Sequence, residues 1–578
     1  MGEPVSQVFN DRYFYKNEGL EESSYVYLIG NKLKDRWGQL NENEIFSIGE
    51  LGFGTGLNFL NTLKLWKENK KAGTKLNYVS IEKFPLTKED IKKSLSNYPS
   101  LKNEIDLLIL KYPKLIRGFH RINFEKEDIS LTLIFQDIDQ SLYDLEGSMS
   151  LFDAWFLDGF SPKENNEMWT DDVFKNIAKL SHSETTASSF SVASNVKDSL
   201  KRNNFNFFRS DGFKNKRHML EAVSTNSIKK LSNKKKEIAV IGAGISGACL
   251  ANSLAKRGHK ITVFEKEKSS NNIPCFVGHP NLSHANTPYS RYLLQSFLFS
   301  TNYYLRNCNS SWNRTGVLVL EGFGSLSERL RKISKTLKDK ELFREVDNNS
   351  FPELDFLKKD LKGFFFSDSG WLHTEKAIKQ LLSHKNIRLI NEEVLSLISN
   401  EPKFKKIATF KNEYIFDEIC LCNSYDAKKI LGIQGVNKKR GQVTEVSNLD
   451  LNLNQPICGK GYITPFDNSR LLIGSTYSEG QSEEIIEEDN KENLELIKEM
   501  FNLNLSAVNS YVGFRSTTKD HLPLLGEKEG FYLNLGHGSK GSISSPFCAE
   551  ILCDVIDGCP IPTDKEVFLS LDPDRFNS

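Results

Sequence analysis

The stretch IAVIGAGISGACLANSLAKRGHKITVFEK, Ile238–Lys266, decides the fold of the second half of the chain. A short apolar run is followed by three glycines, a helical pattern and a second apolar run that ends at Glu265. This order predicts a βαβ unit in which Gly242 allows the turn, Gly244 admits a pyrophosphate and Gly247 lets helix and strand pack closely. Glu265 stands where an acid binds the ribose hydroxyls of a dinucleotide. The stretch therefore predicts a dinucleotide site.

A second glycine turn lies near the C-terminus, far along the chain from the first. It follows the apolar run GFYLNLG and precedes an apolar helical pattern. Two such turns so far apart suggest a fold whose ends meet around one long cofactor, which favours FAD over NAD. The residues expected to contact the cofactor at this turn are Gly538, Ser539, Lys540 and Gly541.

The first half of the chain carries its own glycine loop, ELGFGTGLNFL, which starts at Glu50 directly after the apolar run IFSIG. An acid at this position would repel a pyrophosphate, whereas a cationic sulfonium without phosphate suits it. The next apolar run ends at Glu82, where an acid can bind ribose hydroxyls, and a third ends at Gln136 and Asp137, where an adenine contact is expected. The pattern predicts an S-adenosylmethionine site. The loop glycines expected to approach that ligand are Gly52, Gly54 and Gly56.

A fourth apolar run, in AWFLDGFSPKENNEMW from Ala154 to Trp169, ends at Asp158. A carboxylate at a strand end can bind an amine, orient its lone pair and attract its proton, as methyl transfer to nitrogen requires. Phe160 and Trp169 can stack on a planar base. The plainer interpretation makes Asp158 a helix cap and Trp169 a core aromatic, and both interpretations remain open.

The composition describes a chain of two or three globular domains, with 578 residues, 39% hydrophobic and 26% charged. Its 76 basic and 75 acidic side chains exclude a globally polybasic nucleic-acid binder but allow a local basic patch. Nine cysteines are scattered without a CxxC pair, which predicts a reducing compartment and no metal site. The N-terminus has no signal pattern and no run is apolar enough to cross a bilayer, so we expect a cytoplasmic monomer.

The lysine-rich stretch NSIKKLSNKKKE, Asn226–Glu237, marks the expected domain boundary. A solvated loop within one domain is the alternative, but each side has its own glycine motif. We expect a methyltransferase domain at 1–228, a linker at 229–236 and an oxidoreductase domain at 237–578. The FAD-binding parts of the latter are expected at about 237–300, 364–430 and 505–578, with substrate-binding parts between them.

The fold class expected from the strand and helix patterns is α/β. The first half is predicted to be a Rossmann-like methyltransferase domain, because short apolar runs alternate with helical patterns. The second half opens the same way but later contains strand-rich stretches such as GVLVLEG and RLLIGSTYS. This mixture predicts a FAD-binding Rossmann domain with an α+β substrate domain that is mainly antiparallel sheet.

The motifs of the first half resemble those of the MnmC family of bifunctional tRNA-modification enzymes. ELGFGTGLNFL, YVSIEKFPLT and AWFLDGFSPKENNEMW are similar to its methyltransferase half, whereas SSFSVASNVKDSL keeps only part of the family pattern. GFKNKRHML, Gly212–Leu220, also resembles the family, and its cluster of Lys214, Lys216 and Arg217 is the best local candidate for tRNA phosphate contacts.

The C-terminal stretch from GFRSTTKDHLPLLG onward resembles the glycine oxidase and D-amino-acid oxidase superfamily, and in particular the oxidase half of the same family. Arg515 lies where the superfamily places a carboxylate-binding arginine, and its alternative role is a surface ion pair with Asp520. RGQV, CGKGYITP and IGSTYS match that half too, the last with Tyr477 as a further candidate substrate contact. The sequence departs from the family where Cys275 replaces a glycine-containing turn and where Lys540 replaces a common arginine.

The resemblance implies a two-step modification of a tRNA wobble uridine. The FAD half would remove the carboxymethyl group of 5-carboxymethylaminomethyl-2-thiouridine, and the methyltransferase half would then methylate the resulting 5-aminomethyl group. One alternative is a free amino-acid oxidase fused to a small-amine methyltransferase. Another is a tRNA-binding protein whose catalytic sites have decayed.

Overall fold

The computed structural model divides the chain into two compact units, each described separately below. The residues that it describes are 18–148, 151–160, 164–214, 216–230, 234–267, 273–280, 282–321, 328, 331–333, 342–351, 354, 356–358, 362–400, 404–447, 451, 453–467 and 469–576. The first unit comprises Met1–Lys235 and Asp554–Leu569, and the second Lys236–Cys553 and Ser570–Ser578. Within the described residues, no helix combines the length and the apolar character needed to span a membrane.

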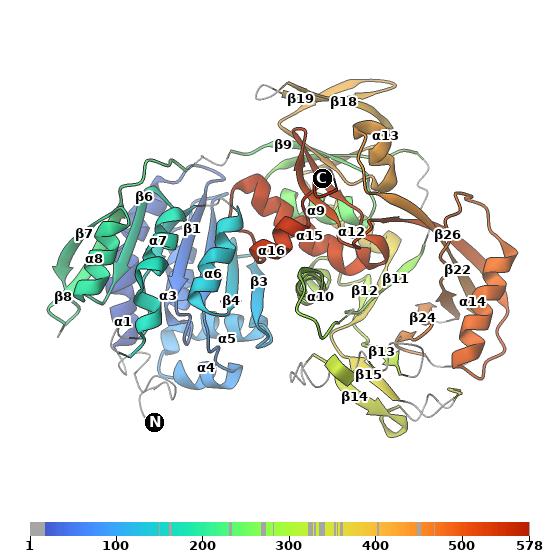
Figure 1. Cartoon of the computed structure of the whole chain (residues 1–578), viewed down its shortest axis with the longest axis horizontal. Helices are drawn as coiled ribbons and strands as arrows, with labels where there is room; N and C mark the ends of the chain where they lie inside the picture. Colours follow the sequence, from blue (N-terminus) through green and yellow to red (C-terminus); the bar gives the residue numbers. More distant parts are fainter. Residues whose placement is uncertain are drawn as a thin grey trace. The chain divides into compact units, whose positions relative to one another are not determined.

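The first unit is built on one eight-stranded sheet in the order β3-β4-β2-β1-β5-β6-β8-β7 (Figure 1). Its five central strands run parallel, and β3, β7 and β8 pair antiparallel at the two edges. The strands are β1 (Ile45–Leu51), β2 (Lys75–Ile81), β3 (Gly118–Phe124), β4 (Ile129–Phe135), β5 (Phe152–Phe156), β6 (Ser181–Ser189), β7 (Phe205–Asp211) and β8 (His218–Ser224).

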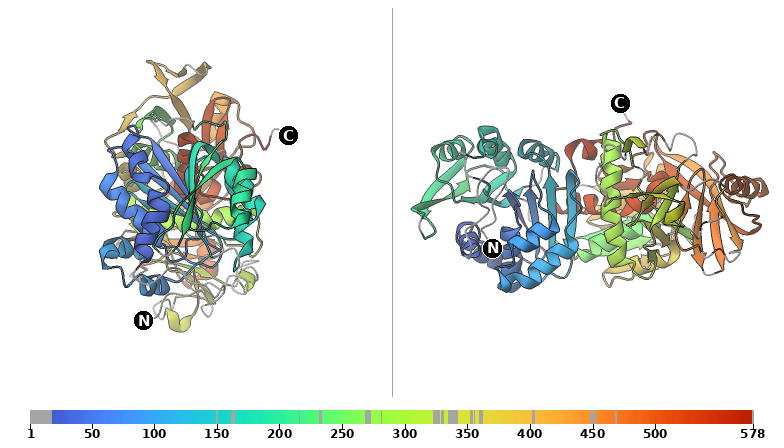
Figure 2. Two further views of the ribbon diagram at one scale, coloured as in Figure 1. Left: turned by 90° about the vertical axis from the view of Figure 1, so that its left-hand side faces the viewer. Right: turned by 90° about the horizontal axis from the view of Figure 1, so that it is seen from below.

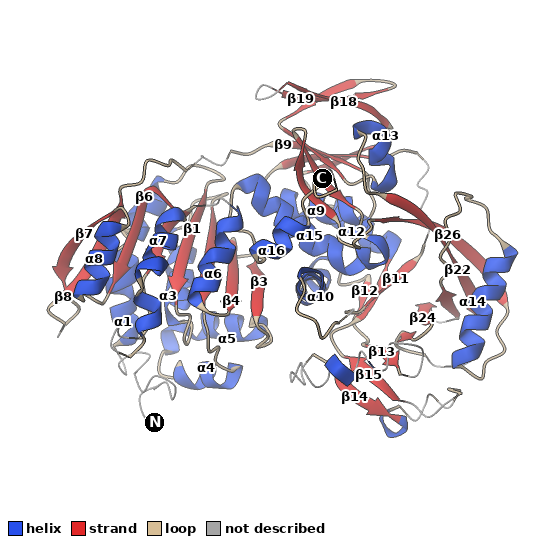
Figure 3. Ribbon diagram, viewed as in Figure 1, coloured by secondary structure: helices blue, strands red, loops and turns tan. Residues whose placement is uncertain are grey.

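Helices cover both faces of this sheet and bury a separate apolar cluster on each (Figures 2 and 3). One cluster includes side chains of α2 (Leu33–Gln39), α3 (Leu57–Asn69), α4 (Lys88–Ser94) and α5 (Lys102–Lys111). The other includes side chains of α6 (Ile138–Leu145), α7 (Asp171–Lys179) and α8 (Ser194–Arg202). The short helix α1 (Gly19–Ser23) and a π-helical turn (Ser24–Ile29) precede them. Strands buried on both faces explain the nearly continuous apolar runs in the sequence.

The segment Asp554–Leu569 completes the first unit from the far end of the chain. Arg121 on β3 is fully buried, pairs with Asp554 and donates a hydrogen bond to Asn77 Oδ1 at 3.0 Å. Lys565 Nζ lies 4.2 Å from the centre of the Tyr143 ring. Two stretches of chain separated by Lys236–Cys553 therefore belong to one compact unit.

The second unit begins with a six-stranded sheet in the order β17-β10-β9-β21-β28-β27. All strands are parallel except the edge strand β27. The strands are β9 (Glu237–Ile241), β10 (Lys260–Phe264), β17 (Ile387–Ile390), β21 (Glu418–Leu421), β27 (Leu524–Lys528) and β28 (Phe531–Leu535), and the helices around them are α9 (Ile245–Lys256), α10 (Pro288–Asn307), α12 (Thr374–Leu382), α13 (Ala427–Leu431) and α15 (Gly541–Asp557).

A second, largely antiparallel sheet of eight strands follows the order β14-β15-β13-β23-β24-β25-β22-β26. Its strands are β13 (Val317–Leu320), β14 (Arg344–Asp347), β15 (Lys362–Phe366), β22 (Asn437–Ser447), β23 (Ile457–Cys458), β24 (Tyr462–Asp467), β25 (Arg470–Gly474) and β26 (Ala507–Thr517), and α14 (Glu487–Met500) packs on it. Two three-stranded sheets complete the unit: β11 (Cys275–Gly278), β16 (Gly370–His373) and β12 (Trp312–Asn313), and β18 (Val394–Asn400), β19 (Phe404–Thr409) and β20 (Glu413–Phe416). The α/β class with a mainly antiparallel substrate sheet is confirmed.

A buried carboxylate ties Lys230, which lies within the expected linker 229–236, to the first sheet. Lys230 Nζ lies 2.5 Å from Asp153 Oδ2 and donates to the Ile45 carbonyl at 2.7 Å. Asp153 also accepts from the Ser47 N–H and lies 3.0 Å from His182 Nε2. Although burial raises the pKa of Asp153, Lys230 and His182 together lower it to about 2. Lys230 is thus part of the folded first unit.

We predict that Lys230→Met destabilises the first unit by about 2 kcal/mol at neutral pH, since it removes the main cation beside a buried carboxylate. Because the folded pKa of Asp153 is below its ordinary value, the wild type keeps this stabilisation above about pH 4 and loses it as the pH falls towards 2. Urea unfolding followed by tryptophan fluorescence measures it, because Trp37, Trp66, Trp155 and Trp169 all lie in this unit. The matched control is Lys229→Met, whose side chain is exposed. Equal stability of the two variants would contradict the prediction.

Candidate cofactor and substrate sites

A cavity of about 460 Å³ opens at the carboxyl ends of the parallel strands of the first unit. Its wall comes from the turns after β1, β2, β4 and β5, the edge where ligands bind in open α/β sheets. The volume suits a ligand of nucleoside size. Of the predicted contacts, the wall includes Gly52, Gly54, Glu82, Gln136, Asp137, Asp158 and Phe160.

Glu82 fixes the glycine loop at one side of the cavity. Its Oε2 accepts the Gly54 N–H at 2.8 Å, and its Oε1 accepts the Phe84 N–H at 2.8 Å. Burial raises the pKa of Glu82, and these two hydrogen bonds oppose that shift. Gly56, the residue directly before α3, lies outside the cavity wall. Its φ of +79° is a conformation that favours glycine.

Asp137 and Gln136, also predicted to contact the ligand, interact with neighbouring side chains at this edge. Asp137 Oδ1 lies 2.7 Å from Lys83 Nζ. The Gln136 side-chain amide donates to Asp144 Oδ2 at 2.8 Å. Both residues nevertheless belong to the cavity wall.

Glu50 lies behind the cavity wall rather than in it. Its carboxylate accepts hydrogen bonds from Asn58 Nδ2 at 3.0 Å and from Ser80 Oγ at 2.6 Å. Burial raises the pKa of Glu50 to about 8, against the effect of the Ser80 hydrogen bond. Glu50 is therefore not part of the cavity wall, whereas Asn58, which binds it, does line the cavity.

Asn58 joins two buried carboxylates and was not predicted from the sequence. The same Nδ2 that binds Glu50 donates to Asp158 Oδ2 at 2.7 Å. Asp158 also accepts the Gly159 N–H at 2.8 Å, and burial raises its pKa. The signal in the sequence was a polar residue in the first turn of an apolar helix, directly after the glycine loop.

The two predicted aromatics differ in placement. Phe160 lines the cavity, whereas Trp169 is 2% exposed, lies outside the wall and donates its Nε1–H to the Phe160 carbonyl at 3.0 Å. Trp169 thus supports the turn that carries Phe160, as a core aromatic would. Residues 161–163 of the same turn lie outside the described part of the chain.

The basic cluster predicted for phosphate contacts is partly neutralised by acids of the N-terminal helix. Lys216 lines the cavity and pairs with Glu22 at 2.5 Å, with its Nζ 4.7 Å from the centre of the Phe190 ring. Lys214 pairs with Glu21 at 3.0 Å, which raises the pKa of the lysine. Arg217 is exposed.

The second unit contains the predicted βαβ turn between β9 and α9. Gly242 has φ +100°, and the Ala243 N–H donates to Glu265 Oε2 at 2.6 Å. A Cβ on Gly247 would lie 1.9 Å from the Gly242 carbonyl oxygen, so only glycine allows this helix to start so close to the strand. A Cβ on Gly244 would meet no atom within 4 Å. The open side at Gly244 and the N-terminus of α9 fit a pyrophosphate.

The closing glycine turn lies against the first one, as the sequence predicts. Residues Gly538–Lys540 form a short 3-10 turn that leads into α15 at Gly541. His537, which was not predicted, contacts Ser246 Oγ at 3.2 Å and Asn534 Oδ1 at 3.0 Å through its Nε2. Burial lowers the pKa of His537 to about 4, so the ring is neutral at physiological pH.

Arg515 on β26 has no carboxylate partner among the residues that the structure describes. Its Nη2 donates to Ser475 Oγ at 2.6 Å, its Nη1 donates to the Thr476 carbonyl at 3.4 Å, and its Cζ lies 5.6 Å from the centre of the Tyr477 ring. Asp520, the alternative partner, pairs instead with Arg575 at 2.8 Å. A largely buried guanidinium without an anion is suited to binding one.

Cys275, where the sequence departs from the family pattern, is a buried residue of the core. Cys275 is buried on β11, and burial raises the pKa of its thiol, so the group is unreactive. The described residues contain no group of His, Cys, Asp or Glu side chains that could hold a metal ion.

Comparison with known proteins finds a matching protein family for each of the two units. Residues 99–225 match the family model of an S-adenosyl-L-methionine-dependent methyltransferase, and residues 237–555 match that of an FAD dependent oxidoreductase. Among solved structures, glycine oxidase from Geobacillus kaustophilus has a TM-score of 0.52 at 19% identity, over 59% of this chain and 99% of that one. L-proline dehydrogenase from P. horikoshii also has a TM-score of 0.52, at 18% identity over 60% of this chain and 98% of that one. These two likenesses show the fold of the second unit.

The two matches define a bifunctional enzyme that joins a methyltransferase using S-adenosylmethionine to an oxidoreductase using FAD. Proteins named tRNA 5-methylaminomethyl-2-thiouridine biosynthesis bifunctional protein MnmC match the whole chain. The one from Marinomonas sp. (strain MWYL1) is 31% identical over 100% of this chain and 96% of its own length. The one from Leptospira interrogans is 30% identical over 99% and 98%. The chain belongs to the MnmC family.

We predict that Gly244→Ala weakens FAD binding by at least about tenfold without lowering the stability of the cofactor-free protein. The added methyl meets no protein atom within 4 Å but enters the space where a pyrophosphate would approach the backbone. Flavin absorbance per polypeptide after dialysis, together with the thermal midpoint of the apoprotein, measures both effects. Gly247→Ala is the contrasting variant, since its methyl clashes with the Gly242 carbonyl and should lower stability as well. Normal FAD content in Gly244→Ala would show that the cofactor does not use this turn.

Proposed function

We propose that this enzyme acts on tRNA and converts 5-carboxymethylaminomethyl-2-thiouridine at the wobble position to 5-methylaminomethyl-2-thiouridine in two steps. The second unit would remove the carboxymethyl group, and the first would methylate the amine that remains. Full-length similarity to proteins named for biosynthesis of this nucleoside supports the substrate. The observation that carries the separation of the two steps is chemical. A buried carboxylate lies in the cavity of the first unit, and the second contains a guanidinium with no carboxylate partner among the described residues. A tRNA substrate also favours a cytoplasmic enzyme, which we expect to be a monomer.

In the first unit, the wall residues divide into ligand-holding and substrate-orienting groups. Glu82 would bind ribose hydroxyls, and Gln136 and Asp137 would contact adenine, while bound S-adenosylmethionine supplies the methyl group. Asp158 would accept a hydrogen bond from the substrate amine and receive its proton, with Asn58 fixing the carboxylate. Phe160 lies in the same wall and can stack on the base.

We predict that Asp158→Asn lowers methylation by at least about 100-fold and leaves oxidation unchanged, because an amide keeps the shape but cannot take the proton. In the wild type, methylation should fall as the pH drops through the raised pKa of Asp158, because only the ionised carboxylate accepts a proton. The measurement is mass spectrometry of tRNA nucleosides, in which 5-aminomethyl-2-thiouridine should accumulate. Asp139→Asn is the control, since this acid lies outside the cavity wall. Equal methylation by both variants would remove Asp158 from the mechanism.

In the second unit, Arg515 would hold the carboxylate of the carboxymethyl group, and bound FAD accepts two electrons from the carbon next to nitrogen. Loss of a hydride from that carbon and of the N–H proton would leave an imine, and addition of water would then release glyoxylate and the 5-aminomethyl product. The guanidinium orients the reacting carbon through two parallel hydrogen bonds. Tyr477, 5.6 Å from the guanidinium and 55% exposed, would form the outer side of this site.

We predict that Arg515→Met lowers kcat/KM for the oxidation step by at least about 100-fold, because the substrate carboxylate loses the guanidinium proposed to bind it. Methylation of pre-formed 5-aminomethyl-2-thiouridine should be unaffected. Arg575→Met is the matched control, since that guanidinium pairs with Asp520. A similar loss in both arginine variants would point to general damage rather than to carboxylate binding.

The substrate itself is tested with tRNA from a host strain that lacks this enzyme. Addition of the purified protein with S-adenosylmethionine should convert the carboxymethylaminomethyl nucleoside to the methylaminomethyl form. An unchanged nucleoside profile would overturn the tRNA proposal. Efficient turnover of free glycine or sarcosine in the same assay would favour a small-molecule enzyme instead.

A further inference from the structure

Strand β22 carries the run Arg440–Val443 and lies between β25 and β26 in the large sheet. Successive side chains of a strand point to opposite faces. Gly441 therefore belongs to the face of Arg515, because Lys439, two residues earlier, is the direct partner of Arg515 on β26. Arg440 and Gln442 belong to the other face. The two faces of the run Arg440–Val443 therefore make different contacts.

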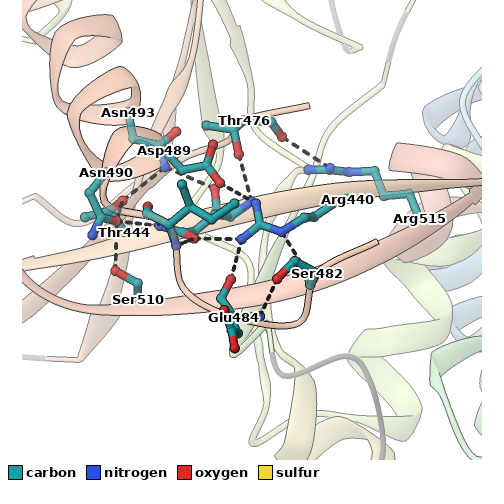
Figure 4. Close-up of polar contacts among 12 residues, drawn as sticks. Arg440, Thr444, Thr476, Ser482, Glu484, Asp489, Asn490, Asn493, Ser510 and Arg515 are labelled. Carbon is teal, nitrogen blue, oxygen red and sulfur yellow. Dashed lines mark hydrogen bonds and ion pairs between the residues drawn. The ribbon is translucent and has the colours of Figure 1, made fainter. Parts of the chain in front are cut away.

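On the first face, the side chain of Arg515 crosses β22 over Gly441. Arg515 starts from β26 on one side of β22, and its guanidinium bonds Ser475 and Thr476, which follow β25 on the other side. Figure 4 shows the bond to Thr476. A Cβ on Gly441 would lie 2.1 Å from Nη1 of Arg515. Any larger residue at this position would displace the guanidinium.

On the opposite face, Arg440 uses its whole guanidinium on protein groups and is 1% exposed. Its Nε donates to the Ser482 carbonyl at 2.9 Å, its Nη2 donates to the Glu484 carbonyl at 2.7 Å, and its Nη1 pairs with Asp489. Figure 4 shows these bonds converging from one loop and the start of α14 onto a single side chain. The rigid fork of an arginine is what allows one residue to hold several acceptors at once.

These contacts fix a segment that we call the strap, Ser475–Ile486. At its start, the Arg440 N–H donates to the Ser478 carbonyl at 2.9 Å, and the Ser478 N–H donates to the Arg440 carbonyl at 3.0 Å. At its end, Gln442 Oε1 accepts the Ile486 N–H at 2.9 Å, and Gln442 Nε2 donates to the Ile486 carbonyl at 2.8 Å. Residues 479–486 between these points are all exposed. Since the strap buries little apolar surface there, hydrogen bonds from β22 determine its position.

A buried polar layer supports the same bonds from behind. Asn490 Oδ1 accepts hydrogen bonds from Gln442, Thr444 and Ser510, each at 2.8 Å (Figure 4). Asn493 Nδ2 donates to the Gln442 carbonyl and to Thr444 Oγ1, each at 3.0 Å. A buried network of this kind favours one arrangement of its members, because moving any of these side chains breaks several hydrogen bonds at once.

We propose that Arg440 is a positioning residue for the substrate carboxylate: by fixing the strap, it sets the places of Ser475, Thr476 and Tyr477 around Arg515. The proposal rests on the proposed role of Arg515 in carboxylate binding. Arg440 lies on the opposite face of the sheet from Arg515 and acts only through the strap. Gly441 acts differently, because its lack of a side chain leaves space for Arg515 to cross β22.

The test uses the full-length protein loaded with FAD, and Arg440→Lys as the main variant. Lysine keeps a charge for Asp489 but lacks the fork that also reaches the Ser482 and Glu484 carbonyls. Glycolate serves as a carboxylate probe, with binding followed by the change in flavin absorbance. Cleavage by a glutamate-specific protease at Glu483 and Glu484 reports on the strap independently of any ligand.

Arg440→Lys should weaken glycolate binding by at least about tenfold and accelerate strap cleavage, while FAD content stays at the wild-type level. Gly441→Ala should weaken glycolate binding without faster cleavage, since it displaces the guanidinium but keeps the strap. Arg257→Lys is the matched control, because this largely buried arginine of the same unit pairs with Glu550 at 3.0 Å, away from the strap. If Arg440→Lys does not fold, Asp489→Asn replaces it and should weaken glycolate binding and accelerate cleavage in the same directions.

The outcomes separate the two proposals. Unchanged glycolate affinity in Arg440→Lys overturns the positioning role, whether or not cleavage accelerates. Weaker binding with an unchanged cleavage rate overturns the route through the strap. If Arg515→Met binds glycolate as well as the wild type does, the carboxylate role of Arg515 itself is wrong.

Discussion

In each unit, a carboxylate at the end of the second strand of a βαβ turn accepts a hydrogen bond from the backbone of the glycine loop. Glu82 binds the Gly54 N–H at 2.8 Å, and Glu265 binds the Ala243 N–H at 2.6 Å. The bond holds the loop against the neighbouring strand and keeps the acid beside the start of the helix. Both cofactor sites depend on it, because a ligand can contact loop and acid together only where the two are already joined.

Apart from this shared hydrogen bond, the two units bury different kinds of ionisable side chain, acids in the first and an arginine in the second. The first places Glu50 and Asp158 around one Asn58 amide, where burial raises the pKa of both acids. The second leaves the Arg515 guanidinium without an acid among the described residues. An amine suits the first environment and a carboxylate the second, as the two proposed steps require.

The large sheet of the second unit shows how one strand can serve two faces. Gly441 contributes only the absence of a side chain, which lets Arg515 cross, while Arg440 and Gln442 on either side of it bind the returning strap. Strand alternation makes this division possible within three consecutive residues. The position of Arg515 therefore depends on β22 in two ways. Gly441 leaves space for its side chain, and Arg440 and Gln442 fix the segment whose residues bind its guanidinium.

The two glycine turns, their acids and the α/β class can be predicted from the residues alone, because strand, turn and helix are local and their spacing is set by backbone geometry. Which side chains share a site became evident only from the packed structure. It paired Lys216 with Glu22 and Lys230 with Asp153, placed Trp169 in the core, and joined Glu50 to Asp158 through Asn58. Lys216 and Glu22, Lys230 and Asp153, and Asn58 and Asp158 come from distant parts of the chain, and no local spacing encodes the distance between them. The pairing of charges depends on which strands and helices become neighbours, and that is settled when the apolar core packs.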